Sequence, residues 1–378
     1  MSDSRKSTND LEFTNRINKL YQQKCSKYSN IHDANVLPAV DRIIVIGDLH
    51  GDFDKTIQCL KLAKVLQEDN KYDTNSKKRY KWVGGETVIV QVGDQIDRCR
   101  NLPCDNPTST KNDENSDIRI LKFFTDLHLK AIKDGGAVYS LIGNHELMNV
   151  TGRMDYVSYQ GSNKFEKEDS YGDQIYTDVL PSNVTDMEAR KWAFQPGNPL
   201  AEYIACTRKL ILKIGDYLFV HAGVLPIVAQ EYPGNAGIKK MNEILSTYLF
   251  NKLDNKELSK HQLLLGPEIA TNNVEAAFDN YHISPLWNRK FGRISRSDDE
   301  KFKSKTCSQI FNPIKKIYSV NKMFVGHTPQ TNNISSSCNG GLWFTDVAMS
   351  KAFDSFGTKQ KDAQVLLIEN DKVEILIG

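Results

Sequence analysis

Short apolar runs that end at a glycine recur along the chain from residue 42 onward. Residues 42–46 (RIIVI), 87–92 (TVIVQV) and 137–142 (AVYSLI) are apolar without alternation, which is the pattern of strands covered on both faces. Apolar residues at helical spacing follow the first two runs, over 52–66 and 118–132. This order of strand, loop and helix predicts βαβ units.

The second half of the chain predicts further strands between longer polar segments. A hairpin is expected around Gly215 and Asp216, and later strands are expected at 323–325, 342–344, 364–368 and 373–377. Residues 151–200 and 232–320 have weak strand signals and favour helical or loop insertions. We therefore expect an α/β fold in which two sheets form the core and helices flank them.

The first 40 residues differ from the rest in being mostly polar. We expect residues 1–40 to form a tail and residues 41–378 to form one domain. Within the tail, Leu11, Phe13, Ile17 and Tyr21 lie at helical spacing and suggest a short helix.

The composition is that of an ordinary folded protein. The 378 residues carry 49 Lys and Arg against 47 Asp and Glu, a net charge of +2, so no basic field indicates nucleic acid or an anionic membrane as a partner. No stretch approaches the ~20 consecutive apolar residues of a membrane-spanning helix, and the N-terminus lacks the apolar core of a secretory signal. These features predict a cytoplasmic protein.

The chain contains seven cysteines, an odd number, and they are spread thinly along it. This usage favours reduced thiols inside a cell over a disulfide framework. For Cys99 and Cys104, which have four residues between them, we expect free thiols, with a redox-sensitive disulfide as the alternative.

Five loops place metal-ligating side chains directly after an apolar run and beside a glycine. Their sequences are GDLHGD (47–52), GDQIDR (93–98), GNHE (143–146), HAG (221–223) and GHTP (326–329). Because the carboxyl ends of the strands in an open α/β sheet form the crevice where ligands bind, we expect these loops to meet at one edge.

The loops offer carboxylate, carboxamide and imidazole groups but no thiolate ligand set; the candidates are Asp48, His50, Asp94, Asn144, His221 and His327. Such a set suits Mn, Fe or Zn. Six ligands exceed what one tetrahedral ion takes, which predicts two divalent ions sharing a bridging carboxylate. Two ions ~3.5–4 Å apart are the arrangement for in-line displacement at phosphorus.

The order and spacing of these loops resemble the signature of the calcineurin-like metallophosphoesterases, and within them the phosphoprotein phosphatases. That family carries GDxHG, GDxxDRG, GNHE, HxG and GHT in this order, and the match here runs from residue 42 to residue 346. The variants GDQIDRC, HAGV and GHTPQ are more similar to the Shewanella-like, bacterial-type branch than to the eukaryotic core of the family. The resemblance implies a two-sheet α/β/β/α sandwich with helical insertions over the active-site face. It also implies a first metal on Asp48 and His50, a bridging Asp94, and a second metal on Asn144, His221 and His327.

The resemblance implies catalytic roles for four other residues. His145, oriented by Asp97, would protonate the leaving group, while water attacks phosphorus directly and no phosphoenzyme forms. Arg98 would bind phosphate oxygens, and Arg289, in the segment SPLWNR (284–289), would be a second phosphate-binding arginine. The alternative for Arg98 is an ion pair with Asp97, and for Arg289 a structural role is about equally expected.

Three positions depart from the pattern of the family. Cys99 stands where a glycine is expected, Ile142 replaces an arginine before GNHE, and FTDVAMSKAF (344–353) stands where the eukaryotic core has SAPNY. The resemblance to the eukaryotic enzymes therefore does not by itself predict the substrate preference.

The resulting hypothesis is a dinuclear metal-dependent phosphatase acting on phosphoserine and phosphothreonine in phosphoproteins, with phosphotyrosine left open. One alternative is a small-molecule phosphoesterase, such as a dinucleoside polyphosphate hydrolase. A second is a non-catalytic, metal-stabilised binding module, against which the intact set of ligands and His145 argues.

Overall fold

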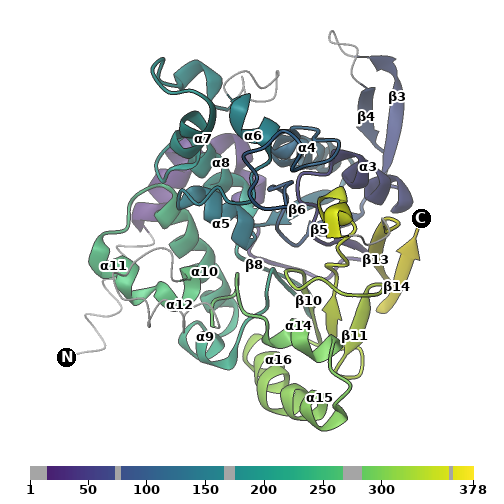
Figure 1. The fold of residues 1–378 in the computed structure, drawn as a ribbon. Helices are drawn as coiled ribbons and strands as arrows, with labels where there is room; N and C mark the ends of the chain where they lie inside the picture. Colours follow the sequence, from purple (N-terminus) through teal and green to yellow (C-terminus); the bar gives the residue numbers. More distant parts are fainter. Residues whose placement is uncertain (1–14, 73–77, 166–174, 267–282, 357–360) are drawn as a thin grey trace, which may run out of the picture.

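The computed structural model describes residues 15–72, 78–165, 175–266, 283–356 and 361–378. Two six-stranded sheets form its centre (Figure 1). In order across the first sheet, the strands are β1 (Val36–Leu37), β8 (Ile211–Ile214), β9 (Tyr217–Val220), β10 (Lys322–Val325), β12 (Leu342–Phe344) and β11 (Ser335–Ser337). Across the second they are β14 (Lys372–Ile377), β13 (Gln364–Glu369), β2 (Arg42–Ile46), β5 (Val88–Gln91), β6 (Ala137–Leu141) and β7 (Arg208–Lys209).

Both sheets mix parallel and antiparallel pairs. In the second sheet β2, β5, β6 and β7 are parallel, with Ile44 opposite Ile89 and Ile89 opposite Val138. In the first sheet β9, β10 and β12 are parallel, whereas β8 and β9 form the expected antiparallel hairpin. The parallel strands point their carboxyl ends the same way, which is the arrangement that the ligand-bearing loops require.

The core lies between the sheets and on their outer faces. The apolar residues of β2, β5, β6 and β13 form one buried cluster with Leu212, Phe219 and Phe324 of the first sheet. A second cluster joins Ile211, Leu218 and other residues of the first sheet to helices. These are mainly α8 (Pro199–Thr207), α10 (Gly234–Leu249) and α16 (Asn312–Tyr318). The predicted α/β/β/α sandwich is confirmed.

Two helices cover the second sheet, and both match local sequence signals. α3 (Phe53–Leu62) begins after Asp52, whose carboxylate accepts the Lys55 N–H at 2.9 Å as an N-cap. α4 (Asp117–Ala131) buries an apolar stripe that includes Phe124 and Leu127, and the chain turns at Gly135 with φ of 82°.

The remaining helices are mostly short and lie around the two sheets. They are α2 (Ser29–His32), α5 (Asn144–Val150), α6 (Tyr159–Asn163), α7 (Asp186–Phe194), α9 (Pro226–Glu231), α11 (Asn255–Lys260), α12 (Gln262–Leu265), α14 (Lys290–Ser295) and α15 (Glu300–Thr306). Short 3₁₀ segments are η1 (Ser26–Tyr28), η2 (Ile132–Asp134), η4 (Thr177–Val179) and η7 (Lys351–Phe356), and the π-helical turn η6 (Cys307–Phe311) joins α15 to α16. Within the described ranges, no helix is both long and apolar enough to cross a membrane.

One hairpin was not predicted. The apolar spacing indicated a helix to residue 66, but α3 ends at Leu62 and Leu66 begins β3 (Leu66–Tyr72), which pairs with β4 (Lys78–Trp82) and extends from one corner of the molecule (Figure 1). Leu66 is buried opposite Trp82. The two strands pair across the loop that joins them, and the spacing of apolar residues along one segment does not reveal such a pairing.

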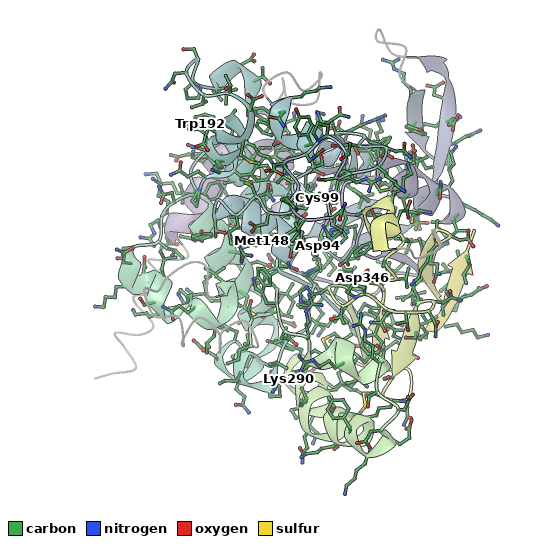
Figure 2. The ribbon with its side chains drawn as sticks, in the orientation of Figure 1. Asp94, Cys99, Met148, Trp192, Lys290 and Asp346 are labelled. Carbon is green, nitrogen blue, oxygen red and sulfur yellow. A yellow bond between two sulfur atoms is a disulfide. The ribbon has the colours of Figure 1, made fainter. Side chains whose placement is uncertain are left out.

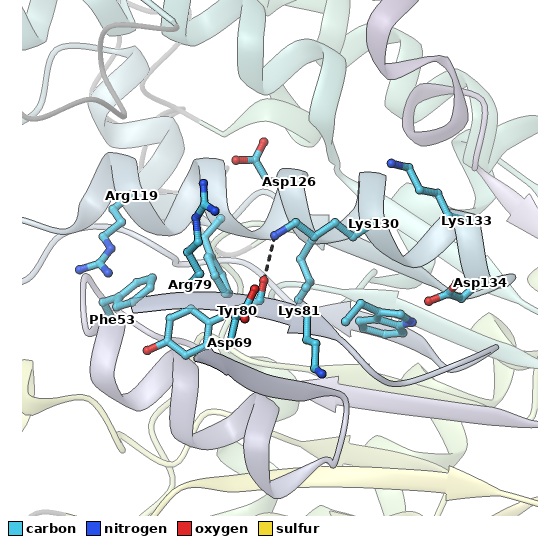
Figure 3. Close-up of a pocket in the computed structure, with 13 residues that line it drawn as sticks. Phe53, Asp69, Arg79, Tyr80, Lys81, Arg119, Asp126, Lys130, Lys133 and Asp134 are labelled. Carbon is cyan, nitrogen blue, oxygen red and sulfur yellow. Dashed lines mark hydrogen bonds between the residues drawn. The ribbon is translucent and has the colours of Figure 1, made fainter. Parts of the chain in front are cut away.

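The hairpin and α4 enclose a surface groove of about 590 Å³ (Figure 3). The rings of Phe53, Tyr80 and Phe123 pack edge to face there, and Lys130 donates from Nζ to the Tyr80 carbonyl at 3.0 Å. None of the predicted metal ligands lines this groove.

The expectation of reduced thiols is wrong for six of the seven cysteines. Disulfides join Cys25 to Cys206, Cys99 to Cys104 and Cys307 to Cys338, and Cys59 is a buried free thiol. Cysteine count and spacing cannot show which thiols the fold brings together, and two of these pairs are 181 and 31 residues apart.

The Cys25–Cys206 bond fastens the N-terminal region to the domain. Residues 15–24 are helical, with Ile17 and Tyr21 buried against the core that contains α8 and α10. Leu11 and Phe13 lie outside the described residues. The disulfide joins the end of this segment to α8.

We expect removal of the Cys25–Cys206 disulfide to lower stability more than removal of Cys307–Cys338. Cross-linking a longer loop removes more chain entropy from the unfolded state, which gives about 1.5 kcal/mol more for a loop of 181 residues than for one of 31. Denaturant unfolding of the two double Cys→Ala variants measures the difference. Equal losses would contradict the tethering role of the first disulfide.

Candidate active site

The five predicted loops bring their ligand side chains to one buried place. Asp48 and His50 follow β2, Asp94 follows β5, and Asn144 begins α5 directly after β6; His221 follows β9 and His327 follows β10. None of the six is more than 4% exposed. Figure 2 shows Asp94 near the centre of the molecule.

Asp94 is the residue on which the others converge. Its Oδ2 lies 3.9 Å from His50 Nε2, 3.9 Å from His145 Nε2 and 3.4 Å from His221 Nε2. Two groups of ligand atoms share it, one with His50 and His145 and one with His221 and His327, and within each group the atoms lie within 4.8 Å of one another. A carboxylate common to two groups is the geometry expected of a bridging ligand.

Each of three histidines has one ring nitrogen close to a backbone carbonyl. His221 Nδ1 lies 2.9 Å from Val92 O, His327 Nε2 lies 2.9 Å from Trp287 O, and His50 Nδ1 lies 3.3 Å from Ile96 O. A carbonyl accepts only from N–H, so these contacts assign the proton to that nitrogen in His221 and His327 and leave the other as an acceptor. His50 Nδ1 also lies 2.6 Å from Arg100 Nη2, which can only donate, so its longer carbonyl contact does not assign the proton.

The other nitrogens of these rings face the ligand oxygens. His221 Nε2 and His327 Nδ1 lie 3.0 and 2.7 Å from Asn144 Oδ1, and His50 Nε2 faces Asp94. In metal-binding histidines one ring nitrogen typically donates its proton to a carbonyl or carboxylate, and the other ring nitrogen binds the metal. The donor set therefore fits metal ions.

The carboxylates of the site are poorly compensated by protein groups alone. Asp48 Oδ2 accepts the His327 N–H at 2.9 Å, but Asp48 Oδ1 is buried without a hydrogen-bond partner within the described chain. Burial, together with the charges of Asp346 and Asp94, raises the pKa of Asp48 well above its usual value. Burial also opposes ionisation of Asp94, yet His221, His145 and His50 hold its pKa well below the usual value.

His145 lies beside Asp94 and has a separate set of partners. Its Nδ1 lies 2.7 Å from Asp97 Oδ2, and Asp97 Oδ1 accepts from Asn149 Nδ2 at 2.9 Å. Asn149 Oδ1 in turn accepts from Arg190 Nε at 2.8 Å. His145 Nε2 faces the site, 3.9 Å from Asp94 Oδ2.

The backbone at the site requires unusual conformations. His50, Asp94, Asp97 and His327 have φ of 42°, 52°, 71° and 66°, which is uncommon for residues other than glycine and clusters at functional sites. A Cβ at Gly326 would lie 2.1 Å from Asp48 Oδ1, so the glycine permits His327 to approach Asp48.

Glu146 is a buried residue whose function the sequence analysis did not assign. Its carboxylate accepts backbone N–H groups from Gly143 (2.6 Å), Asp94 (3.1 Å), Gln95 (2.7 Å) and Ile96 (3.2 Å). It thus fixes the Asp94 loop to the Asn144 loop. Its place in the GNHE run was a signal that it belongs to the site.

Asp346 is a second residue that the sequence analysis did not assign. It is 1% exposed, and its Oδ2 is among the buried oxygens without a partner in the part of the chain described. Burial raises the pKa of this carboxyl, with a further contribution from Asp94. It lies in FTDVAMSKAF (344–353), the segment that departs from the family pattern, and the sequence analysis predicted no ligand role for it.

Three arginines in or beside the predicted loops have different partners. Arg98 is buried, with Nη2 3.5 Å from Lys111 O. Arg100 lies close to two histidines, with Nη2 2.6 Å from His50 Nδ1 and 3.4 Å from His145 Nε2. Arg289, at the start of α14, donates from Nη1 to His327 O at 3.3 Å.

Comparison with known proteins agrees with this architecture. The sequence profile of the calcineurin-like phosphoesterase family matches residues 41–331. An uncharacterised protein of Acanthamoeba polyphaga mimivirus is 36% identical over 267 residues, covering 66% of this chain and 95% of that protein. Shewanella-like protein phosphatase 2 of Arabidopsis thaliana is 26% identical over 334 residues, covering 82% of this chain and 72% of that protein.

The fold is also similar to that of a solved structure. The cold-active protein-tyrosine phosphatase of a psychrophilic Shewanella species superposes with a TM-score of 0.56 and 19% identity, covering 92% of this chain and 84% of that one. The predicted family and its Shewanella-like branch are confirmed by these matches. The chain belongs to the calcineurin-like phosphoesterase family, on the side of the Shewanella-like phosphatases.

Proposed function

We propose that the protein is a phosphoprotein phosphatase that hydrolyses phosphoserine and phosphothreonine monoesters with two divalent metal ions. Membership of the family gives the coarser statement, that the chain is a metal-dependent phosphoesterase. The observation that carries the proposal is the convergence of three imidazoles on Asp94, next to the hydrogen-bonded pair His145–Asp97.

The proposed ligands divide between the two ions as the sequence suggested. One ion would be held by Asp48, His50 and Asp94, and the other by Asp94, Asn144, His221 and His327. When bound, the ions supply Lewis-acid activation of water and neutralise phosphoryl oxygens. Mn, Fe and Zn suit this set of ligands.

His145 has the geometry of a general acid. Its Nδ1–H donates to Asp97, so its Nε2 is the atom that would carry a proton to the leaving oxygen. Asn149 holds Asp97 from behind, which fixes the orientation of the imidazole. Arg289 lies beside His327, where its guanidinium would bind a phosphoryl oxygen. The role predicted for Arg98 stays a prediction.

A phosphoprotein substrate is supported by the names of the relatives, which include protein phosphatases of Arabidopsis thaliana and Plasmodium berghei. Phosphotyrosine is the second candidate, because similar solved structures carry the name protein tyrosine phosphatase. A dinucleoside polyphosphate is the small-molecule alternative.

We expect Asp94→Asn to lower turnover of p-nitrophenyl phosphate by more than about a hundredfold, because the variant loses the carboxylate shared by both groups of ligands. Metal content measured on the purified variant should fall together with activity. The exposed Asp298→Asn is the matched control. Undiminished turnover by Asp94→Asn would refute the proposal.

Removal of the metal ions tests the same site in the wild-type protein. Chelation should abolish wild-type activity, and added Mn²⁺ should restore it.

We expect His145→Asn to affect poor leaving groups most. A serine alkoxide needs a proton from the general acid, whereas p-nitrophenolate leaves readily without one. Turnover of a phosphoserine peptide should therefore fall about 10²–10⁴-fold and turnover of p-nitrophenyl phosphate considerably less. Equal losses on the two substrates would contradict a role in protonation.

We expect faster hydrolysis of phosphoserine and phosphothreonine peptides than of the matched phosphotyrosine peptide. The peptides share one sequence and are assayed by release of inorganic phosphate, beside a dinucleoside tetraphosphate assayed for nucleotide products. A preference for phosphotyrosine would replace the proposed specificity, and preference for the dinucleotide would overturn the assignment to phosphoproteins.

A further inference from the structure

The surface groove between the β3–β4 hairpin and α4 is lined by two kinds of side chain that recognise a partner in different ways (Figure 3). The aromatic ones are Phe53, Tyr80, Trp82 and Phe123, and the cationic ones are Arg79, Lys81, Arg119, Lys130 and Lys133. Aromatic rings offer apolar contact area, and cations attract acidic groups. The lining is therefore suited to a partner that carries both apolar and acidic side chains.

The aromatic side chains are fixed by contacts among themselves and with two cations. The ring centre of Phe123 lies 5.2 Å from that of Phe53 and 5.8 Å from that of Tyr80, both edge to face. The central carbon of Arg119 lies 3.5 Å from the ring centre of Phe53. Lys130 on α4 donates to the Tyr80 carbonyl on β4 and so joins the two walls of the groove. A groove that is already formed needs little ordering when a partner binds.

Two of the lysines have a charge that no neighbouring acid neutralises. Lys81 on β4 and Lys133 in η2 are exposed, and neither forms an ion pair with another described residue. Figure 3 shows Lys133 at the end of the groove opposite Arg119. Positive charge is thus present at both ends of the groove.

The carboxylates of the groove narrow the choice of partner. They belong to Asp69, Asp126 and Asp134, of which Asp126 forms an ion pair with Lys122 within α4. A nucleic acid carries a charge on every phosphate, so carboxylates along the groove would repel it. An acidic peptide carries its charges at intervals and can place apolar side chains between them, which fits a lining of alternating cations, rings and acids.

One end of the groove adjoins the loop that carries two of the predicted metal ligands. Phe53 begins α3 directly after GDLHGD (47–52). Ser116, the residue before α4, donates to the Gly51 carbonyl at 2.7 Å and holds the same loop. A protein bound in the groove therefore lies beside the candidate active site without occupying it.

We propose that this groove binds an acidic segment, with apolar side chains among its carboxylates, of the phosphoproteins on which the enzyme acts. The identity of the partner rests on the proposed function, whereas binding of such a segment does not depend on turnover. Docking outside the active site raises the effective concentration of the substrate, which lowers KM and leaves the chemical step unchanged.

Fluorescence anisotropy of a labelled peptide of glutamates and leucines, titrated with the full chain, tests the binding. The double variant Lys81→Glu/Lys133→Glu should weaken binding at least about tenfold, because it places like charges opposite each other. The matched control Lys301→Glu/Lys305→Glu makes the same change of charge at exposed positions of α15, outside the groove, and should change binding less than about twofold. A peptide with serine in place of leucine should bind more weakly, and one with lysine in place of glutamate should not bind.

The identity of the partner is tested by joining the glutamate–leucine segment to a phosphoserine peptide through a Gly-Ser linker. In the Mn²⁺-loaded wild type, KM for the joined peptide should be lower than that for the phosphoserine peptide alone by about tenfold or more, at unchanged kcat. The Lys81→Glu/Lys133→Glu variant should lose this difference and keep its turnover of p-nitrophenyl phosphate.

Binding that the two groove substitutions leave unchanged, equal binding of the lysine-containing peptide, or tighter binding of a uridine oligonucleotide would overturn the proposal. If the double variant does not fold, the order of affinities of the three peptides for the wild type decides. Binding without a lower KM for the joined peptide overturns the assignment of the segment to substrates. Wild-type protein that hydrolyses no phosphoester means that the proposed function has failed, and the anisotropy titrations still decide whether the groove binds an acidic segment.

Discussion

The concentration of buried acceptors around Asp94 is the constraint on which the rest of the structure depends. Asp48, Asp94 and Asp346 are nearly inaccessible to solvent, and buried oxygens of Asp48 and Asp346 lack partners among the described residues. Burying such charges without compensation is costly. Ring nitrogens of His221 and His327 face the oxygens of Asp94 and Asn144 and have backbone carbonyls on their other side, so bound divalent cations would compensate these buried acceptors.

The candidate metal ligands are held in place mainly by contacts between different loops. Glu146 binds four backbone N–H groups from two loops, and Gly326 leaves the room that Asp48 needs. Behind His145, the chain Asp97–Asn149–Arg190 extends into α7. An insertion outside the two sheets therefore supports the catalytic face, which couples packing of α7 to the orientation of the proposed general acid.

The sequence was sufficient to predict the features that depend on one short segment of the chain. Strand, glycine and ligand follow one another within each loop, so Asp48 and His221 could be named from local pattern and family resemblance. The hairpin at Leu66, the Cys25–Cys206 disulfide and the burial of Asp346 depend on residues brought together from afar, and local spacing does not report them.

The central claim is that side chains from five loops bind two divalent ions that share Asp94. Anomalous scattering from crystals grown with Mn²⁺ tests it most directly. The account predicts two peaks on either side of the Asp94 carboxylate, about 3.5–4 Å apart, one towards His50 and the other towards His221 and His327. A single peak away from Asp94, or no peak at saturating Mn²⁺, would contradict it.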